Sequence, residues 1–94
     1  MKKQGLYLTS QIAKMFGKTQ AWFYWSENNG KFTYENGDPI EPTYIPETGR
    51  GKSYDLDTIQ EIALSLYRNG TLGEDGLKEV LAKILVEKEK SADS

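Results

Sequence analysis

Cysteine and histidine are both absent from this chain of 94 residues, and their absence excludes several kinds of chemistry. No disulfide, thiolate nucleophile or zinc site built on these ligands can form. Histidine is also the side chain that most often acts as a general base near neutral pH. The carboxylates form no spaced pair outside predicted helix caps and solvated helix faces, so we expect no enzyme and assign no catalytic residue, metal or cofactor.

Long apolar runs are missing as well, and none approaches the roughly 20 residues that span a bilayer. Hydrophobic residues make up 37% of the chain and charged residues 28%, and the mean hydropathy is -0.66, which is typical of a soluble globular protein. The start of the chain lacks the apolar block of a signal peptide. We expect one cytoplasmic domain over residues 1–94, with flexible ends at 1–6 and 91–94.

Net positive charge is absent, because the formal charge is -2, but the charges are unevenly distributed along the sequence. Residues 1–26 contain four lysines and no acid, whereas residues 27–54 carry a net charge of -2 and residues 55–94 a net charge of -4. A basic first quarter favours contact with phosphates, and an acidic remainder keeps the opposite face off DNA. Polarity of this size also arises by chance in soluble domains, so both readings stay open.

Residues 8–25, with the sequence LTSQIAKMFGKTQAWFYW, predict a helix-turn-helix. Apolar residues recur at every fourth position in the first half, which favours a short amphipathic helix from about Ser10 to Phe16. Thr9 or Ser10 can cap the start of this helix. Gly17 follows its last apolar residue, where a left-handed backbone favours a residue without a Cβ.

The second helix carries the aromatic residues of this stretch. Thr19 is predicted to cap it, and we expect it to end near Asn28, which is followed by Asn-Gly. Successive side chains on a helix are 100° apart, so the aromatic residues cannot all face the core. We expect Phe23 and Trp25 to be buried and Trp22 to be partly exposed.

Such a second helix typically lies in the major groove of DNA, with its first residues at the base edges. Glutamine can bind adenine through two hydrogen bonds, and lysine can contact guanine or phosphate. Tyr24 follows Gln20 by about one turn and shares its face. An ordinary solvated helix surface is the alternative. The predicted DNA contacts of the second helix are Lys18, Thr19, Gln20, Trp22 and Tyr24, and those of the first helix, to the DNA backbone, are Ser10 and Lys14.

The middle of the chain is predicted to be extended. Residues 31–35 alternate polar and aromatic side chains, which is typical of a half-buried strand, and Asn36-Gly37 predicts a tight turn. Three prolines exclude a helix from the connection 36–46, which can be a hairpin or an ordered loop.

A wing is predicted next, from antiparallel pairing of residues 43–45 with residues 51–54 around a glycine-rich tip. A wing can reach phosphates or the minor groove beside a helix in the major groove. Arg50 and Lys52 are the predicted DNA contacts of the wing, against the alternative of a solvated hairpin tip. Tyr54 is expected to pack beneath it and to offer its hydroxyl to a phosphate. The turn is too short for a phosphate-binding P-loop, so we expect no nucleotide site.

Two amphipathic helices complete the chain. The third begins at a cap formed by Asp55 or Asp57 and ends at Asn69-Gly70, and the fourth begins near Glu74. We expect the fourth helix to dock on the third within the monomer, the alternative being that it lends Val86 to a partner chain. The apolar face of the third helix is Ile59, Ile62, Ala63, Leu66 and Tyr67, and that of the fourth is Leu77, Val80, Leu81, Ile84 and Leu85.

The order of helix-turn-helix, wing, third helix, glycine and fourth helix resembles the MerR-like winged-helix superfamily, which includes small phage and plasmid excisionases. The resemblance rests on LTSQIAKMFGKTQAWFYW, GRGKSYDLDTIQEIALSLYRNG and TLGEDGLKEVLAKIL, and it spans the chain from about Leu8 to Leu85. In the second helix the aromatic run Trp22–Trp25 replaces an arginine that is frequent in the superfamily. The resemblance implies a mainly α winged helix-turn-helix with a small β-hairpin and four helices, in the cytoplasm of a bacterial host cell.

The function implied by this resemblance is sequence-specific binding of double-stranded DNA, as a phage or prophage excisionase, a recombination directionality factor or a transcriptional regulator. The implied partners are DNA, further copies of the chain in a dimer or a cooperative array on DNA, and a phage integrase. The alternative is a protein-interaction module, such as a small phage inhibitor of a host protein. The acidic C-terminal region and a partly exposed Trp22 favour that alternative.

Overall fold

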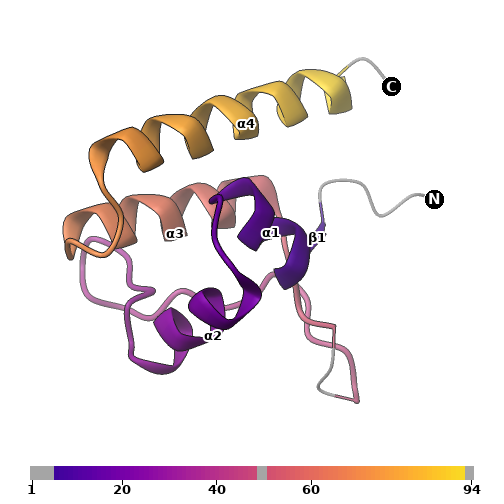
Figure 1. Cartoon of the computed structure of the whole chain (residues 1–94). Helices are drawn as coiled ribbons and strands as arrows, with labels where there is room; N and C mark the ends of the chain where they lie inside the picture. Colours follow the sequence, from indigo (N-terminus) through magenta and orange to yellow (C-terminus); the bar gives the residue numbers. More distant parts are fainter. Residues whose placement is uncertain (1–5, 49–50, 93–94) are drawn as a thin grey trace.

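The computed structural model describes residues 6–48 and 51–92, with the backbone alone for residues 91 and 92. Within these ranges the chain is mainly helical, with four helices and a small two-stranded antiparallel sheet. In chain order the elements are β1 (Tyr7–Leu8), α1 (Thr9–Met15), α2 (Gln20–Asn28), β2 (Ser53–Tyr54), α3 (Leu56–Arg68) and α4 (Glu74–Ala92). Figure 1 shows α4 running alongside α3, with α2 beyond α3 from α4.

The connection between α1 and α2 is the predicted glycine turn. Gly17 has a φ of 69°, in the left-handed region, and the N–H of Lys18 donates to the carbonyl of Ala13 at 2.9 Å. The Thr19 hydroxyl accepts from the N–H of Trp22 at 3.1 Å, which confirms the predicted cap of α2. The turn therefore fixes the direction in which α2 leaves α1.

The start of α1 differs from the prediction that Thr9 or Ser10 caps it. Leu8 is the capping residue, and its N–H donates to Oε1 of Gln11 at 2.9 Å. A glutamine three residues into the helix thus satisfies the backbone in place of a capping hydroxyl. Thr9 is instead the first residue of α1 and is buried, with its hydroxyl turned to α2.

The sheet places the start of the chain against the predicted wing. Tyr7 pairs with Tyr54 and Leu8 with Ser53, in an antiparallel arrangement that was not predicted. The pairing of 43–45 with 51–54 is reduced to one antiparallel bridge, in which Tyr44 and Ser53 exchange backbone bonds of 3.1 and 3.0 Å. Proline has no N–H to donate, and prolines at 42 and 46 flank this bridge, which explains why the pairing does not extend.

Residues 31–40 form a loop seated on α3 rather than the predicted strand at 31–35. Its strand-like feature is an isolated bridge between Thr33 and Pro39, although the predicted turn is present, with Gly37 at a φ of 96°. Side chains of α3 take the place of a strand partner. The buried Ser65 hydroxyl accepts from the N–H of Thr33 at 2.9 Å and donates to the carbonyl of Lys31 at 2.5 Å.

The core gathers around α3 and Phe23. Asp55 caps α3 by accepting from the N–H of Thr58 at 2.8 Å, as predicted. The Phe23 ring packs against three neighbouring rings at centroid distances of 5.0 to 6.5 Å. Tyr67 is exposed, contrary to its predicted place on the apolar face, because it lies at the C-terminal end of α3. The fully buried apolar residues of α3 are Ile59, Ile62, Ala63 and Leu66.

Helix α4 docks on α3 within the chain, which confirms the preferred arrangement. Val80 and Ile84 are buried, whereas Leu85 and Val86 are exposed. A hydrogen bond also attaches α4 to β1, in which the Tyr7 hydroxyl donates to Oε1 of Glu87 at 2.9 Å. Across the described ranges, no helix has the length and apolar character needed to cross a membrane.

Candidate nucleic-acid interface

A groove of about 510 Å³ opens between α2, the start of α1 and the segment that leads into β2. One wall is the face of α2 that carries Gln20, Tyr24, Glu27 and Asn28, and the opposite wall includes Lys52. Residues spaced by four, seven and eight positions lie on one side of a helix, so the α-helical period alone brings these four together. The cap at the start of α2 then sets the direction of that face.

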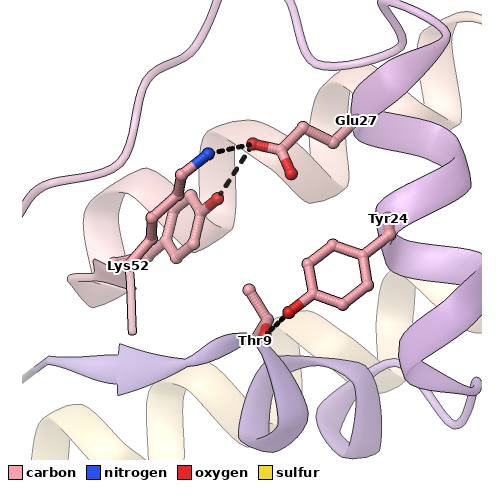
Figure 2. A network of polar contacts seen from close by, with 5 residues as sticks. Thr9, Tyr24, Glu27 and Lys52 are labelled. Atoms are coloured by element: carbon pink, nitrogen blue, oxygen red, sulfur yellow. Dashed lines mark hydrogen bonds and ion pairs between the residues drawn. The ribbon is translucent and has the colours of Figure 1, made fainter. Parts of the chain in front are cut away.

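The first polar network of the groove joins α1 to α2. Figure 2 shows Thr9 and Tyr24 pointing toward each other, with their oxygens 3.0 Å apart. Nε2 of Gln20 donates to the Thr9 hydroxyl at 3.1 Å and to the Tyr24 hydroxyl at 3.2 Å. Two predicted DNA-contacting residues, Gln20 and Tyr24, are thereby held in a defined orientation at the rim of the groove.

The second network joins α2 to the segment before α3. Nζ of Lys52 lies 3.9 Å from Oε2 of Glu27, and the Tyr54 hydroxyl donates to the same oxygen at 3.4 Å. Figure 2 shows the carboxylate of Glu27 reaching from α2 toward Lys52. The ion pair is long and partly exposed, so it adds little to the free energy of unfolding. Its effect is to position Lys52 at the wall of the groove.

Tyr54 is fully buried, and the expectation that its hydroxyl is free for a phosphate is wrong. The ring packs edge-on against Phe23 with the centroids 5.9 Å apart, and the hydroxyl is used by Glu27. Burial, and then the charge of Glu27, raise the pKa of the Tyr54 phenol above its ordinary value. Tyr54 therefore supports the groove from below.

The aromatic residues of α2 are divided between core and surface. Phe23 is buried as predicted, and Trp22 is half-buried against Phe16, with ring centroids 5.9 Å apart and Nζ of Lys18 at 5.7 Å from the Trp22 ring. Trp25 is 53% exposed, so its predicted burial is wrong. Trp25 follows Phe23 by two residues, and at about 100° per residue the two side chains point to nearly opposite sides of α2. A helix that is covered on one side cannot bury both.

The structure brings only some of the predicted DNA contacts into the groove. Ser10, Gln20, Tyr24 and Lys52 line it or its rim, whereas Lys14, Lys18 and Trp22 lie outside it. Arg50 lies outside the described residues. The exposed predicted contacts are Ser10, Lys14, Lys18, Thr19, Gln20 and Tyr24.

Three residues of the groove had no predicted role in binding. Thr9 was expected only as a cap, and Glu27 and Asn28 had no assigned function. The spacing from Gln20 through Tyr24 to Glu27 and Asn28 is a helical-face signal that could have found the latter two. Over residues 6–48 and 51–92, no group of three or more acidic side chains is arranged to hold a metal ion.

The structure defines a mainly helical domain with a small sheet and a groove beside its second helix. The chain belongs to the family described as a domain of unknown function, DUF7229, whose model matches residues 3–87. No curated protein and no solved structure matches the chain.

Proposed function

We propose that this protein binds double-stranded DNA in a sequence-specific way, as a winged helix-turn-helix domain with α2 in the major groove. The observation that carries the proposal is the groove beside α2, in which Gln20 and Tyr24 stand on the same face as Asn28 and opposite Lys52. Nε2 of Gln20 donates to Thr9 and Tyr24, which leaves its Oε1 to accept from the amino group of a base, and a lysine opposite it can contact the DNA backbone.

The dimensions of α2 suit this role. Its nine residues make a rod about 13 Å long, comparable to the major-groove width of about 12 Å. Much of its surface is uncovered, since Gln20, Ala21, Tyr24, Trp25 and Asn28 are all exposed. The core covers α2 at Phe23 and Ser26, with Trp22 packed against it, which leaves the opposite side of the helix available to a partner.

The segment around the Tyr44–Ser53 bridge is proposed as the wing. This bridge and the β1–β2 pairing fix the segment next to α2, and Figure 1 shows it projecting from the helical body. Lys52 is held 3.9 Å from Glu27, so a phosphate can compete for it at small cost. Lys14 and Lys18 are both exposed, and no acid precedes Glu27 in the chain.

The test compares a base-reading variant with a phosphate-binding variant on duplexes selected from a randomised library. Gln20→Ala is expected to change which duplexes are preferred, because an amide that distinguishes bases is lost. Lys52→Gln is expected to weaken binding to every duplex by a similar factor and to lower the salt dependence by about one counterion. No selectable duplex, or identical effects of the two variants, would contradict the proposal.

Within this proposal, the resemblance to MerR-like proteins favours an excisionase, a recombination directionality factor or a phage regulator. These roles differ in partner, because an excisionase acts with an integrase on adjacent DNA. Co-purification with an integrase only in the presence of the selected duplex is the expected result for the first two roles. Independent binding without such a complex favours the regulator.

A protein-interaction module is the second candidate function, and the exposed indole of Trp25 favours it. Tryptophan is enriched at the centres of protein interfaces, and Trp25 is 53% exposed on a helix that also exposes Tyr24. This reading predicts a protein complex that survives high salt and is lost in Trp25→Ala, together with no affinity for DNA. The DNA-binding reading predicts the opposite salt response.

A further inference from the structure

Glu27 is the first acidic residue in the sequence, and it stands on the same face of α2 as Gln20 and Tyr24. A carboxylate at a surface that approaches DNA repels phosphates, so its presence in the groove requires an explanation. Lys52 and the Tyr54 hydroxyl both contact Oε2 of Glu27, at 3.9 and 3.4 Å. These two contacts orient Oε2 of Glu27 toward Lys52 and Tyr54.

The second carboxylate oxygen, Oε1, has no partner among the described residues. Figure 2 shows it on the side of the carboxylate away from Lys52. Because Tyr54 and Lys52 both contact Oε2, Oε1 remains as a hydrogen-bond acceptor on a side chain that lines the groove. An acceptor of this kind needs a donor from whatever enters.

DNA offers such a donor on two of its four bases. In the major groove cytosine presents the amino group N4 and adenine the amino group N6, whereas guanine and thymine present acceptors at O6, N7 and O4. A fixed carboxylate attracts the first pair and repels the second, so it selects by attraction and by repulsion together. Phosphates, which are also acceptors, are rejected in the same way.

We propose that Glu27 is a specificity-determining residue, which accepts a hydrogen bond from the exocyclic amino group of a cytosine or adenine at one position of the DNA site. This inference rests on the proposed function and adds to it the base chemistry that the groove reads. Lys52 offsets part of the negative charge of Glu27. The bond from Tyr54 fixes the carboxylate, so the preference follows from position as well as charge.

The experiment measures affinity by fluorescence anisotropy for the selected duplex and for duplexes in which each position is changed in turn to the other three bases. The wild-type chain is expected to prefer an amino-bearing base at one position by about tenfold. In Glu27→Met, which removes both carboxylate oxygens, that preference is expected to disappear, while preferences at the other positions remain. Glu35→Met makes the same change at an exposed residue outside the groove and is expected to leave every preference unchanged.

A second measurement uses the wild-type chain and modified DNA, so that it does not depend on the folding of a variant. N4-methylcytosine or N6-methyladenine at the selected position keeps the pairing hydrogen and blocks the amino hydrogen that faces the major groove. The modification is expected to weaken wild-type binding by about tenfold and to leave the binding of Glu27→Met unaffected. The identity of the preferred base distinguishes cytosine from adenine.

Two results would overturn the inference while leaving the proposed function intact. One is a Glu27→Met variant that binds all duplexes more tightly by a single factor, which would make Glu27 a general repulsive charge. The other is wild-type binding that no methylated base weakens. A wild-type chain that selects no duplex would instead contradict the proposed function itself.

Discussion

The Tyr24 hydroxyl lies 3.0 Å from the Thr9 hydroxyl, so a side-chain hydrogen bond joins the second helix to the first residue of the first helix. Gln20 donates to both oxygens from one amide nitrogen. The three side chains come from the parts of the helix-turn-helix that we propose to face DNA. Their orientation is set by the protein before any ligand binds, which lowers the entropic cost of recognition.

Removing the Tyr24 hydroxyl tests this preorganisation. Tyr24→Phe loses the bonds to Thr9 and Gln20 at a partly exposed site, so we expect a loss of about 0.5 to 1.5 kcal/mol in the free energy of unfolding. DNA binding is expected to weaken because Gln20 becomes free to rotate. Urea denaturation and anisotropy measure the two effects. Tyr67→Phe, on an exposed tyrosine of α3, is the matched control and should change neither.

The glycine turn is tested by adding a Cβ. Gly17 has a φ of 69° with open space around it, so Gly17→Ala introduces backbone strain without a clash and should cost about 1 kcal/mol. Gly73 also has open space but no left-handed backbone, and it directly precedes α4, so Gly73→Ala should cost only the small difference between glycine and alanine as a cap. Urea denaturation of both variants measures the difference. Equal stability of the two would show that the α1–α2 turn is not strained by a side chain.

Ser65 is the buried residue through which α3 bonds the loop 31–40. Its hydroxyl bonds both the N–H of Thr33 and the carbonyl of Lys31, and only the carbonyl has a second partner, Nδ2 of Asn69. Ser65→Ala should therefore cost about 1 to 3 kcal/mol by leaving the N–H of Thr33 unsatisfied. Hydrogen exchange at the amide of Thr33 should quicken in the variant. Exposed Ser10→Ala is the control for loss of a hydroxyl and should leave both quantities unchanged. Unchanged exchange at Thr33 in Ser65→Ala would contradict this account.

Alkaline pH is expected to loosen the attachment of α4 to β1. Burial raises the pKa of Tyr7, and the hydrogen bond to Glu87 and the negative charge of Glu87 raise it further. The pKa is about 12, against an ordinary value of 10.0. The folded state therefore binds this proton more tightly than the unfolded state. The stabilisation is complete below pH 10 and is lost as the pH rises from 10 toward 12.

The measurement is the urea midpoint at about pH 8 and about pH 11 for the wild-type chain and Tyr7→Phe. The variant should show a smaller alkaline loss than the wild type. Some loss should remain, because the pKa of Tyr54 is also raised. Tyr34→Phe changes an exposed tyrosine and should behave as the wild type does. A Tyr7→Phe curve identical to that of the wild type would exclude a contribution from this phenol.

The local parts of the fold could be predicted from the sequence, because their signals lie within a few residues of one another. The caps at Thr19 and Asp55 and the left-handed Gly17 depend on adjacent backbone, and the structure contains all three. The strand β1 could not be predicted. Its two residues are too few to show a period, and its partner at Ser53–Tyr54 is far along the chain.

The candidate site could be predicted only in part, for a similar reason. Gln20 and Tyr24 are four positions apart in the sequence, so helical geometry alone predicts that they share a face. The exposure of Trp25 and the burial of the Tyr54 hydroxyl depend on which side of α2 the core occupies. The role of Glu27 depends on Lys52 and Tyr54, which are more than twenty residues away.

The most direct test of the central claim is the affinity of the wild-type chain for its selected duplex and for a shuffled duplex of the same composition, each measured at low and at physiological salt. A sequence-specific DNA-binding domain should prefer the selected duplex by about a thousandfold or more at physiological salt, and both affinities should fall steeply as salt rises. Equal affinity for the two duplexes, or no binding to either at low salt, would contradict the account.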